Sequence, residues 1–453
     1  MVFSSHIFVF VFLPIVLISQ IIIKHTKIRN AILLLASIIF YSWGEPIYVF
    51  LFVFTILLNY AMVLIADVFG KKKKIIGAVA IIIDVLILFW FKYSAWVGAI
   101  FSVSLSQQVL PVGISFYTFQ AISYVIDVVF FEKYKAEINI VNMGLYIAFF
   151  PQLIAGPIIR YEQMKEQIRN RTISIACLEE GSFRFVLGFC KKVLLADSIS
   201  IIVEKAFSLC GDLSMPFAWL GAIAYTFQIY LDFSGYSDMA IGLGKMFGFS
   251  IPENFTDPYK ASTIRDFWRR WHITLSIWFR DYVYIPLGGS RYGKVATIRN
   301  MAIVWMLTGL WHGANWTFII WGAVYGLLVI LEKEMNVAKR LEAMSGFVRV
   351  SYRLFTMTAV ICLWVIFRAE DIRTAGIYLQ KMFCLNFQNI DIFVLYCSEF
   401  KWEILGCCLY CFSPLSKNNL DRRIYWPILF GFFIISISYL VKGTYSPFLY
   451  FHF

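Results

Sequence analysis

Charged side chains are scarce in this sequence. Asp, Glu, Lys and Arg make up only 15% of the 453 residues, whereas hydrophobic residues make up 60%. Soluble globular domains carry about a quarter charged residues, so a water-soluble fold would lack polar surface here. The same composition excludes a disordered chain, which combines low hydrophobicity with high net charge. A membrane protein with several spanning segments remains.

Metal-binding motifs are also scarce, and the C-x-x-C formed by Cys408 and Cys411 lies inside an apolar run without a partner pair, which makes it a weak metal or redox signal. No HExxH motif occurs, and the nine cysteines lie mostly in apolar stretches, as Cys190, Cys362 and Cys407 do. Such cysteines are typical of small core hydrophobes rather than of a disulfide framework. The sequence therefore predicts no metal site and no permanently bound cofactor.

The excess of positive charge fits a membrane topology. Lys and Arg number 40 against 28 Asp and Glu, a net charge of +12. Basic segments at 24–30, 69–74 and 132–137 alternate with loops that carry no Lys or Arg. The positive-inside rule then places these three segments in the cytoplasm and the N-terminus outside. We expect the basic excess to fix topology rather than to bind nucleic acid.

The apolar runs are long and continuous, so they predict helices rather than the alternating strands of a membrane barrel. At about 20 residues a span, the length allows roughly ten to thirteen spans. Runs fall at 1–23, 31–43, 48–67, 75–101, 109–131, 141–159, 183–202, 214–231, 301–311, 315–331, 354–367 and 424–441, with weaker ones at 372–384 and 402–412. One membrane domain, 1–453, is the simplest organisation.

The run 141–159 breaks the alternation of charge, because basic residues follow it where an outside loop is expected. Gly156-Pro157 near its end would break a helix. Two interpretations stay open. The run is either a re-entrant segment that walls a cavity or a short span that ends there.

The segment from Asp232 to Asn315 has a different character, with shorter apolar runs and charges among aromatic residues. Polar groups at membrane depth indicate function by default. The alternative is a cytoplasmic loop whose amphipathic helices lie on the membrane surface.

Only two of the five histidines, His272 and His312, lie where burial is expected; the others lie near the chain ends or in a basic loop. His312 stands in TGLWHGANW, after an apolar run. Gly309 and Gly313 flank it and would let another backbone or a thin substrate come close. A histidine in apolar surroundings stays neutral and can accept a proton, and Asn315 could orient the ring. The alternative is a core histidine in a tightly packed helix pair.

His272 stands in RDFWRRWHITLSIWFRDYVYIPLGG. Read as one continuous helix, this segment puts five polar residues on one face. They are Arg265, Arg269, His272, Ser276 and Arg280. Asp266 and Arg270 are spaced for an i,i+4 ion pair. The basic face could meet a lipid headgroup or the phosphates of a nucleotide-type substrate, and charge alone does not choose between them.

Three strings then point to a known family. YLDFSGYSDMAIG, PENFTDPYKASTIRDFWRRWHITLSIWFRDYVYIPLGGSR and TGLWHGANWTFIIWG resemble the membrane-bound O-acyltransferase (MBOAT) superfamily. LPVGISFYTFQAISYVID and FFPQLIAGPIIR also match its alginate O-acetyltransferase branch. The resemblance covers about residues 5–335, and 336–453 would add C-terminal transmembrane helices.

The resemblance implies an all-α, polytopic integral membrane protein of the MBOAT fold, with about 11–13 helices around a tunnelled central chamber. It implies an O-acyltransferase in the cytoplasmic membrane, with acetyl-CoA or an acyl carrier thioester as the donor substrate. The acetyl group would pass to a hydroxyl of an exported polysaccharide or of a partner protein outside. Alginate-like polymer, cellulose, peptidoglycan and teichoic acid are all compatible acceptors.

Site residues follow from the resemblance together with the pattern. His312 would be the general base, since a neutral imidazole can take the acceptor's proton, and His272 a second catalytic residue. The donor phosphates would suit Arg265, Arg269 and Arg270. The remaining substrate-binding candidates are Asp266, Trp268, Ser276, Tyr236, Ser237, Asp238, Asn254, Tyr284, Gly309, Trp311, Gly313 and Asn315. Asn315 and the hydroxyls of Tyr236 or Tyr284 could hold the thioester carbonyl oxygen, although Asn315 stands where the family commonly has serine.

Two other functions stay open. Teichoic acid D-alanyl transfer proteins share the DFWRRWH-like segment, so a carrier protein could be the donor. A transporter or flippase would instead use intramembrane charges such as Asp84, Lys92 and Asp127.

Overall fold

The computed structural model describes residues 2–106, 108–412 and 422–441, and within these it contains helices, turns and extended connections but no strand. This confirms the predicted all-α class. Two compact units are present. The first comprises Met1–Phe189 with Tyr236–Glu253, and the second Cys190–Gly235 with Asn254–Phe453. The prediction of one membrane domain over 1–453 stays a prediction.

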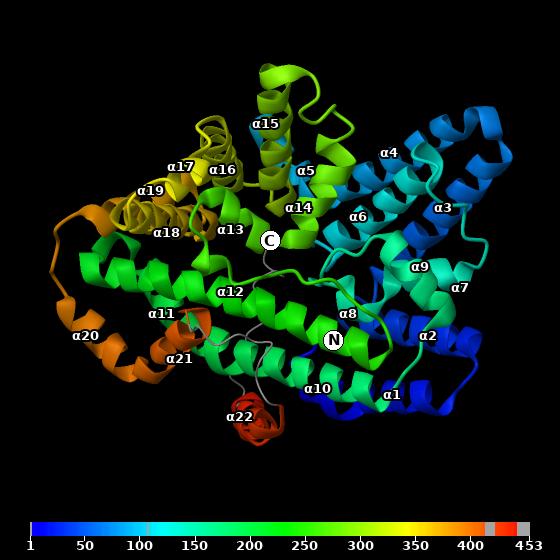
Figure 1. Cartoon of the computed structure of the whole chain (residues 1–453), viewed down its shortest axis with the longest axis horizontal. Helices are drawn as coiled ribbons and strands as arrows, with labels where there is room; N and C mark the ends of the chain where they lie inside the picture. The colour runs from blue at the N-terminus through cyan, green and yellow to red at the C-terminus, as the bar shows by residue number, and fades with distance from the viewer. Residues whose placement is uncertain (1, 107, 413–421, 442–453) are drawn as a thin grey trace. The chain divides into compact units, whose positions relative to one another are not determined.

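The first unit contains the N-terminal helices (Figure 1). They are α1 (Leu13–Ile22), α2 (Thr26–Gly44), α3 (Val49–Val68), α4 (Lys73–Lys92), α5 (Ser94–Ile100), α6 (Ile114–Val125), α7 (Ile140–Ala148), α8 (Phe150–Leu153), α9 (Tyr161–Asn170) and most of α10 (Ile175–Cys190).

The second unit contains the rest (Figure 1). Its helices are α11 (Asp197–Ser208), most of α12 (Met215–Met246), α13 (Ile264–Arg270), α14 (Ile273–Phe279), α15 (Gly293–His312), α16 (Trp316–Glu334), α17 (Val337–Glu342), α18 (Gly346–Arg368), α19 (Ile372–Phe383), α20 (Ile390–Glu399), α21 (Lys401–Phe412) and α22 (Arg422–Val441).

Four described helices are long and apolar enough to cross a membrane. They are Val49–Val68, Gly70–Lys92, Trp316–Glu334 and Gly346–Arg368. Shorter apolar helices occupy Phe8–Ile22, Ile114–Phe130 and Tyr425–Val441. The protein is therefore a multi-pass membrane protein, as predicted, whereas the number of about 11–13 helices around a chamber stays a prediction.

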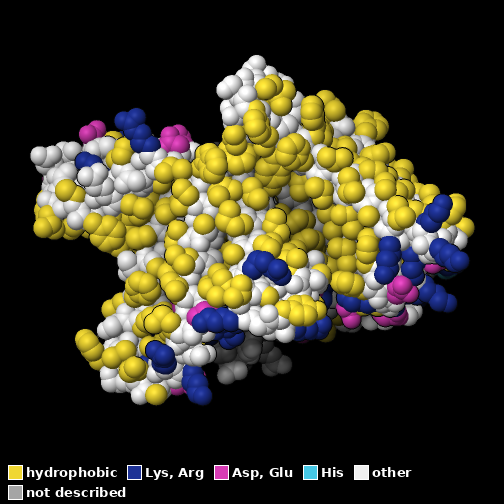
Figure 2. All heavy atoms as spheres, turned by 90° about the horizontal axis from the view of Figure 1, so that it is seen from above, with side chains coloured by type: hydrophobic (Ala, Val, Ile, Leu, Met, Phe, Trp, Pro, Cys, Tyr) yellow, Lys and Arg dark blue, Asp and Glu magenta, His cyan; other side chains and the backbone are white. Residues whose placement is uncertain are grey.

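Large apolar side chains cover much of the surface, as a lipid-facing protein requires. Phe50 is 77% exposed on α3 and Ile75 is 66% exposed on α4. Figure 2 shows hydrophobic side chains over most of the face in view, with Lys and Arg gathered in a few clusters. A water-soluble monomer rarely exposes so large an apolar surface.

The helix break predicted near Gly156-Pro157 is present. α7 ends at Ala148, the four-residue helix α8 follows, and the chain turns at Ile154–Gly156 before an extended stretch. Residues 143–159 are all buried within the first unit. Such burial fits non-helical backbone inside a membrane protein, and both interpretations of the run stay open.

Candidate functional site

His312 is the last residue of α15, at the point where the chain turns into α16. The two helices pack backbone to backbone through glycines. A Cβ at Gly309 would lie 2.5 Å from the Phe318 carbonyl oxygen, and one at Gly322 would lie 2.7 Å from the Trp305 carbonyl oxygen. The expected close approach of another backbone at Gly309 is thus confirmed. Whether substrate also passes there stays a prediction.

Aromatic rings surround His312, which is only 6% exposed. The rings of Trp311, Trp321 and Phe367 each lie 5.0 Å from the imidazole, centroid to centroid, in edge-on arrangements. Gly313 follows in extended backbone, and a Cβ there would meet the Phe318 ring at 2.4 Å. An imidazole in apolar surroundings like these favours its neutral form.

His272 interrupts the helix that the sequence predicted. The continuous helix is wrong, because α13 ends at Arg270, His272 adopts a left-handed conformation (φ 45°), and α14 starts at Ile273. Backbone groups around the break bond to a distant segment instead. The N–H of Thr256 donates to the Arg270 carbonyl at 3.0 Å, and the N–H of Ile273 donates to the Asn254 carbonyl at 3.0 Å.

Asn254 fixes the His272 side chain as well as the backbone. Its Oδ1 lies 3.2 Å from Nδ1 of His272 and accepts hydrogen bonds from the Thr274 hydroxyl at 2.9 Å and the Thr274 N–H at 3.3 Å. The Phe233 ring packs edge-on against the imidazole at 4.8 Å. Burial lowers the pKa of His272 to about 3, so its ring is neutral at pH 7.

The structure brings the two predicted catalytic histidines to one indole. The Trp311 ring lies 5.8 Å from the His272 ring and 5.0 Å from the His312 ring. Both histidines are buried, as expected. Of the other three, His6 and His25 are exposed, and His452 lies outside the described residues. His272 and His312 with Trp311 and Asn254 therefore form the candidate site.

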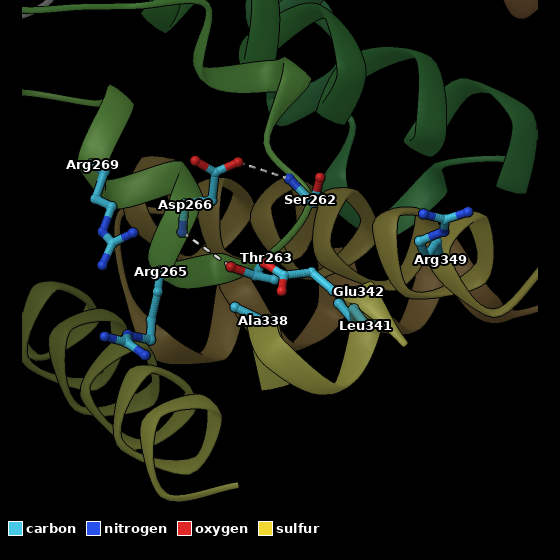
Figure 3. A pocket seen from close by; sticks show the side chains of 9 residues that line it. All are labelled: Ser262, Thr263, Arg265, Asp266, Arg269, Ala338, Leu341, Glu342 and Arg349. Atoms are coloured by element: carbon cyan, nitrogen blue, oxygen red, sulfur yellow. Dashed lines mark hydrogen bonds between the residues drawn. The ribbon is translucent and has the colours of Figure 1, made fainter. Parts of the chain in front are cut away.

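The basic residues of α13 have two different roles. Arg270 pairs with Asp266 at 2.8 Å, which confirms the predicted i,i+4 ion pair. Arg265 and Arg269 form no salt bridge with any described residue, and both line a pocket of about 320 Å³ (Figure 3). The predicted face that they share with Ser276 and Arg280 is absent, because the helix breaks between them.

A buried carboxylate that the sequence analysis missed holds α13 in place. Glu332, 4% exposed near the end of α16, accepts hydrogen bonds from the N–H groups of Ile264 at 2.7 Å and Arg265 at 2.8 Å. The Tyr352 hydroxyl donates to the same carboxylate at 3.0 Å. The only sequence signal was an acidic residue at the end of an apolar run.

The predicted binding residues on α12 belong to the first unit. Asp238 is paired with Arg184, whose Nε donates to Oδ1 at 2.6 Å, and Arg184 also holds Glu253 at 2.7 Å. Tyr236 and Ser237 are buried in the same unit. Arg184 and Glu253 were not foreseen.

A second missed cluster lies in the second unit, where a π-helical turn spans Lys191–Ala196. The Lys192 ammonium lies 2.6 Å from Asp197 and 2.6 Å from Asp232, and its side chain is 2% exposed. Lys191 donates to the Ser234 hydroxyl at 3.0 Å. The two lysines thus hold the residues on either side of Phe233, the ring that packs on His272.

The remaining candidates have identifiable positions. Asn315 caps α16 by accepting from the Thr317 N–H at 3.1 Å, and its amide donates to the Glu370 carbonyl at 2.7 Å. Trp268 is buried against Trp305, Tyr284 is half-buried near Gly289, and Ser276 is exposed. Contact of these residues with a substrate stays a prediction.

The charges that a transporter would use lie in the first unit, and each has another partner. Asp84 accepts from Asn59 at 3.1 Å, Lys92 donates to Ser115 at 3.4 Å, and Asp127 pairs with Lys133 at 2.8 Å. These contacts are typical of charges that serve structure.

Comparison with known proteins places the chain. The family described as "MBOAT, membrane-bound O-acyltransferase family" matches residues 132–370. The chain belongs to this family. It is 43% identical to the probable alginate O-acetylase AlgI of Pseudomonas syringae, over 84% of this chain and 75% of that protein. It is also 33% identical to the peptidoglycan O-acetyltransferase of Helicobacter pylori, over 85% of this chain and 80% of that protein.

A more limited similarity extends to the teichoic acid D-alanyltransferase of Streptococcus thermophilus, 30% identical over 48% of this chain and 56% of that protein. All three relatives are named for the transfer of an acyl group. The chain is therefore an O-acyltransferase of the MBOAT family, in its alginate O-acetyltransferase-like branch, and the predictions of family and enzyme class are confirmed. The family match contains both histidines of the candidate site.

Proposed function

We propose that this enzyme transfers an acetyl group from a cytoplasmic thioester such as acetyl-CoA to a hydroxyl of a polysaccharide outside the cytoplasmic membrane. His312 is the general base of this reaction. The observation that carries the proposal is the burial of His312 and His272 against the same indole in a member of this family. Relatives named for alginate and peptidoglycan O-acetylation support the type of acceptor.

In this reaction the acceptor needs activation and the donor does not. A thioester already carries a good leaving group, whereas a sugar hydroxyl is a weak nucleophile near neutral pH. A neutral imidazole removes the hydroxyl proton as the oxygen attacks the thioester carbonyl carbon. The new C–O bond forms, the C–S bond breaks, and the leaving thiolate takes up a proton. His312 is suited to this step because its aromatic surroundings disfavour the charged form.

His272 has a supporting position in this proposal. Its Nδ1 is held by Asn254 and its ring is clamped between Phe233 and Trp311. A neutral second imidazole against the same indole can orient the acceptor or stabilise charge that develops at the thioester oxygen. Trp311 contacts both rings, and both histidines are buried, which strengthens any electrostatic contribution there.

The test follows labelled acetyl groups. Membrane vesicles from cells that express the chain receive acetyl-CoA labelled in the acetyl group, and label in extracytoplasmic polymer is measured. We expect His312→Ala to reduce transfer at least about a hundredfold, as loss of a general base does. His25→Ala is the matched control, because His25 is exposed and far along the chain. Size-exclusion profiles confirm that both variants fold. Undiminished transfer by His312→Ala would refute the assignment.

Donor identity separates the acetyl proposal from D-alanyl transfer. The similarity to a D-alanyltransferase covers about half of the chain, whereas the O-acetylase similarity covers most of it. We therefore expect acetyl-CoA to donate without a carrier protein. Transfer that strictly requires a charged carrier protein would instead favour the D-alanyl type of reaction.

A further inference from the structure

A pocket on the second unit lies beside α13, α17 and α18 (Figure 3). Its volume is about 320 Å³. Pockets that enclose a complete drug-sized ligand begin at about this volume, so this one is sized for part of a larger molecule. The lining residues are Ser262, Thr263, Arg265, Asp266, Arg269, Ala338, Leu341, Glu342 and Arg349.

The charged residues of the lining carry an excess of positive charge. Arg265, Arg269 and Arg349 form no salt bridge with any described residue, whereas Asp266 is neutralised by Arg270 at 2.8 Å. Glu342 is then the one lining carboxylate that no described cation offsets. A guanidinium group matches phosphate oxygens with a planar pair of N–H donors and remains charged at any physiological pH. Three such groups around one pocket favour an anion.

The arginines lie on two sides of the pocket. In Figure 3, Arg265 and Arg269 extend from α13 on one side, and Arg349 stands on α18 on the other, with Ser262 and Asp266 between them. A ligand with two separate phosphate groups on one sugar would meet both sides.

The backbone that carries these arginines is fixed in advance. Glu332 binds the first two N–H groups of α13, and the Thr263 hydroxyl accepts from the N–H of Asp266 at 3.1 Å. The Thr356 hydroxyl donates to the Ser262 carbonyl at 3.3 Å, which ties the same turn to α18. A preorganised frame loses less conformational entropy when a ligand binds.

We propose that this pocket binds the phosphate groups of the nucleotide part of the donor, while its thioester arm extends toward the histidines. The inference rests on the proposed thioester donor. It adds Arg349 to the predicted phosphate-binding residues and removes Arg270, which is engaged by Asp266. The chain itself links the two sites, since Arg269 is three residues before His272.

The experiment compares two donors in purified enzyme. Acetyl-CoA carries the nucleotide phosphates, and S-acetylpantetheine carries the same thioester without them. In the wild type we expect the KM for acetyl-CoA to be at least about a hundredfold lower than the KM for S-acetylpantetheine. Arg349→Gln and Arg265→Gln/Arg269→Gln should each raise the KM for acetyl-CoA about tenfold or more, with kcat and the KM for S-acetylpantetheine unchanged.

Arg353→Gln is the matched control, because Arg353 is an exposed arginine one turn further along α18 that does not line the pocket. Adenosine 3′,5′-bisphosphate should compete with acetyl-CoA in the wild type and lose potency in the pocket variants. Unchanged KM for acetyl-CoA in both pocket variants would overturn the proposal. Such a result would leave His312 untouched, because transfer itself would still occur.

A membrane lipid is the other source of phosphate, and nanodiscs separate it from the donor. The assay is run in phosphatidylcholine discs with and without phosphatidylglycerol. We expect the pocket variants to lose donor affinity equally in both. If the variants lose only a dependence on phosphatidylglycerol and retain the wild-type KM for acetyl-CoA, the pocket binds lipid headgroups and the donor proposal is wrong.

Discussion

Replacing Lys192 with methionine would leave two carboxylates buried without their cation. Lys192 lies 2.6 Å from both Asp197 and Asp232, and the side chains of Lys192 and Asp232 are only 2% and 3% exposed. Breaking a buried ion pair by removal of one partner costs about 3–5 kcal/mol, because the remaining charge loses its compensation. We expect Lys192→Met to lower the free energy of unfolding of the second unit by about this amount.

The loss can be measured as a shift in thermal unfolding. For a cooperative unit of 150–250 residues, 1 kcal/mol corresponds to about 2–4 °C in Tm. Lys192→Met should therefore lower the Tm of detergent-purified protein by about 6–20 °C. Lys245→Met is the control. Lys245 pairs with Glu180 at 3.1 Å, but both side chains are about 40% exposed, so its loss should cost at most about 1 kcal/mol.

A compensated variant tests the reason as well as the magnitude. Lys192→Met combined with Asp197→Asn and Asp232→Asn removes all three charges together. Replacing a whole buried ionic cluster is often neutral or stabilising, so this triple variant should recover most of the lost Tm. If the triple variant is no more stable than Lys192→Met, uncompensated charge is not the cause. If Lys192→Met matches Lys245→Met, the cluster is not buried as described.

Three further outcomes are expected. Gly309→Ala should destabilise the protein by about 1–3 kcal/mol and reduce acetyl transfer, because its methyl group would lie 2.5 Å from the Phe318 carbonyl oxygen. Gly376→Ala is the control, since the space around Gly376 is open. Equal Tm values for the two variants would contradict this packing. Asn254→Ala should lose about 1–3 kcal/mol of stability and lower kcat, since it leaves the buried Thr274 N–H unbonded; an unchanged kcat would remove Asn254 from the site. The contribution of His272 to wild-type stability should fall by up to about 1.4 kcal/mol per pH unit below pH 6.5, which amounts to about 2 kcal/mol at pH 5. A plot of Tm against pH should therefore slope less in His272→Gln than in the wild type, by the amount that His272 contributes.

The sign of the pH effect follows from the buried ring. His272 has a pKa of about 3 in the folded protein against an ordinary value of about 6.5. As the pH falls, the unfolded chain takes up a proton first, so protons favour unfolding. The contribution is fully present above pH 6.5 and is lost progressively toward pH 3. His272 lies outside the four helices identified as long enough to cross a membrane. In the unfolded chain its imidazole therefore exchanges protons with water and has the ordinary pKa of about 6.5.

Local features of the fold could be predicted from the sequence where hydrophobic length decides them. The run 48–67 became α3, and 315–331 became most of α16. The pair Asp266–Arg270 followed from helical spacing alone. Each of these depends on residues close in the chain, so no tertiary information was needed.

The continuous helix through His272 was wrong for the opposite reason. Residues 264–279 have helical spacing throughout, and nothing local marks the break. The break is set by Asn254 and Thr256, which bond to the backbone on either side of it from a segment 14 or more residues away. The cap by Glu332, 67 residues from Arg265, and the Lys192–Asp232 pair were missed for the same reason.

The helix break at His272 gives the arginines of α13 and the histidine itself different surroundings. In one continuous helix, Arg265, Arg269 and His272 would share a face, and the guanidinium charges would weaken the imidazole as a base. The break instead leaves Arg269 exposed beside the pocket that Arg265 and Arg349 also line, and it buries His272 among aromatic rings. A left-handed residue other than glycine costs about 1–3 kcal/mol. The hydrogen bonds that Asn254 accepts from Ile273 and Thr274 offset that strain. One buried asparagine thus allows an anion-binding arginine and a neutral histidine to lie three residues apart.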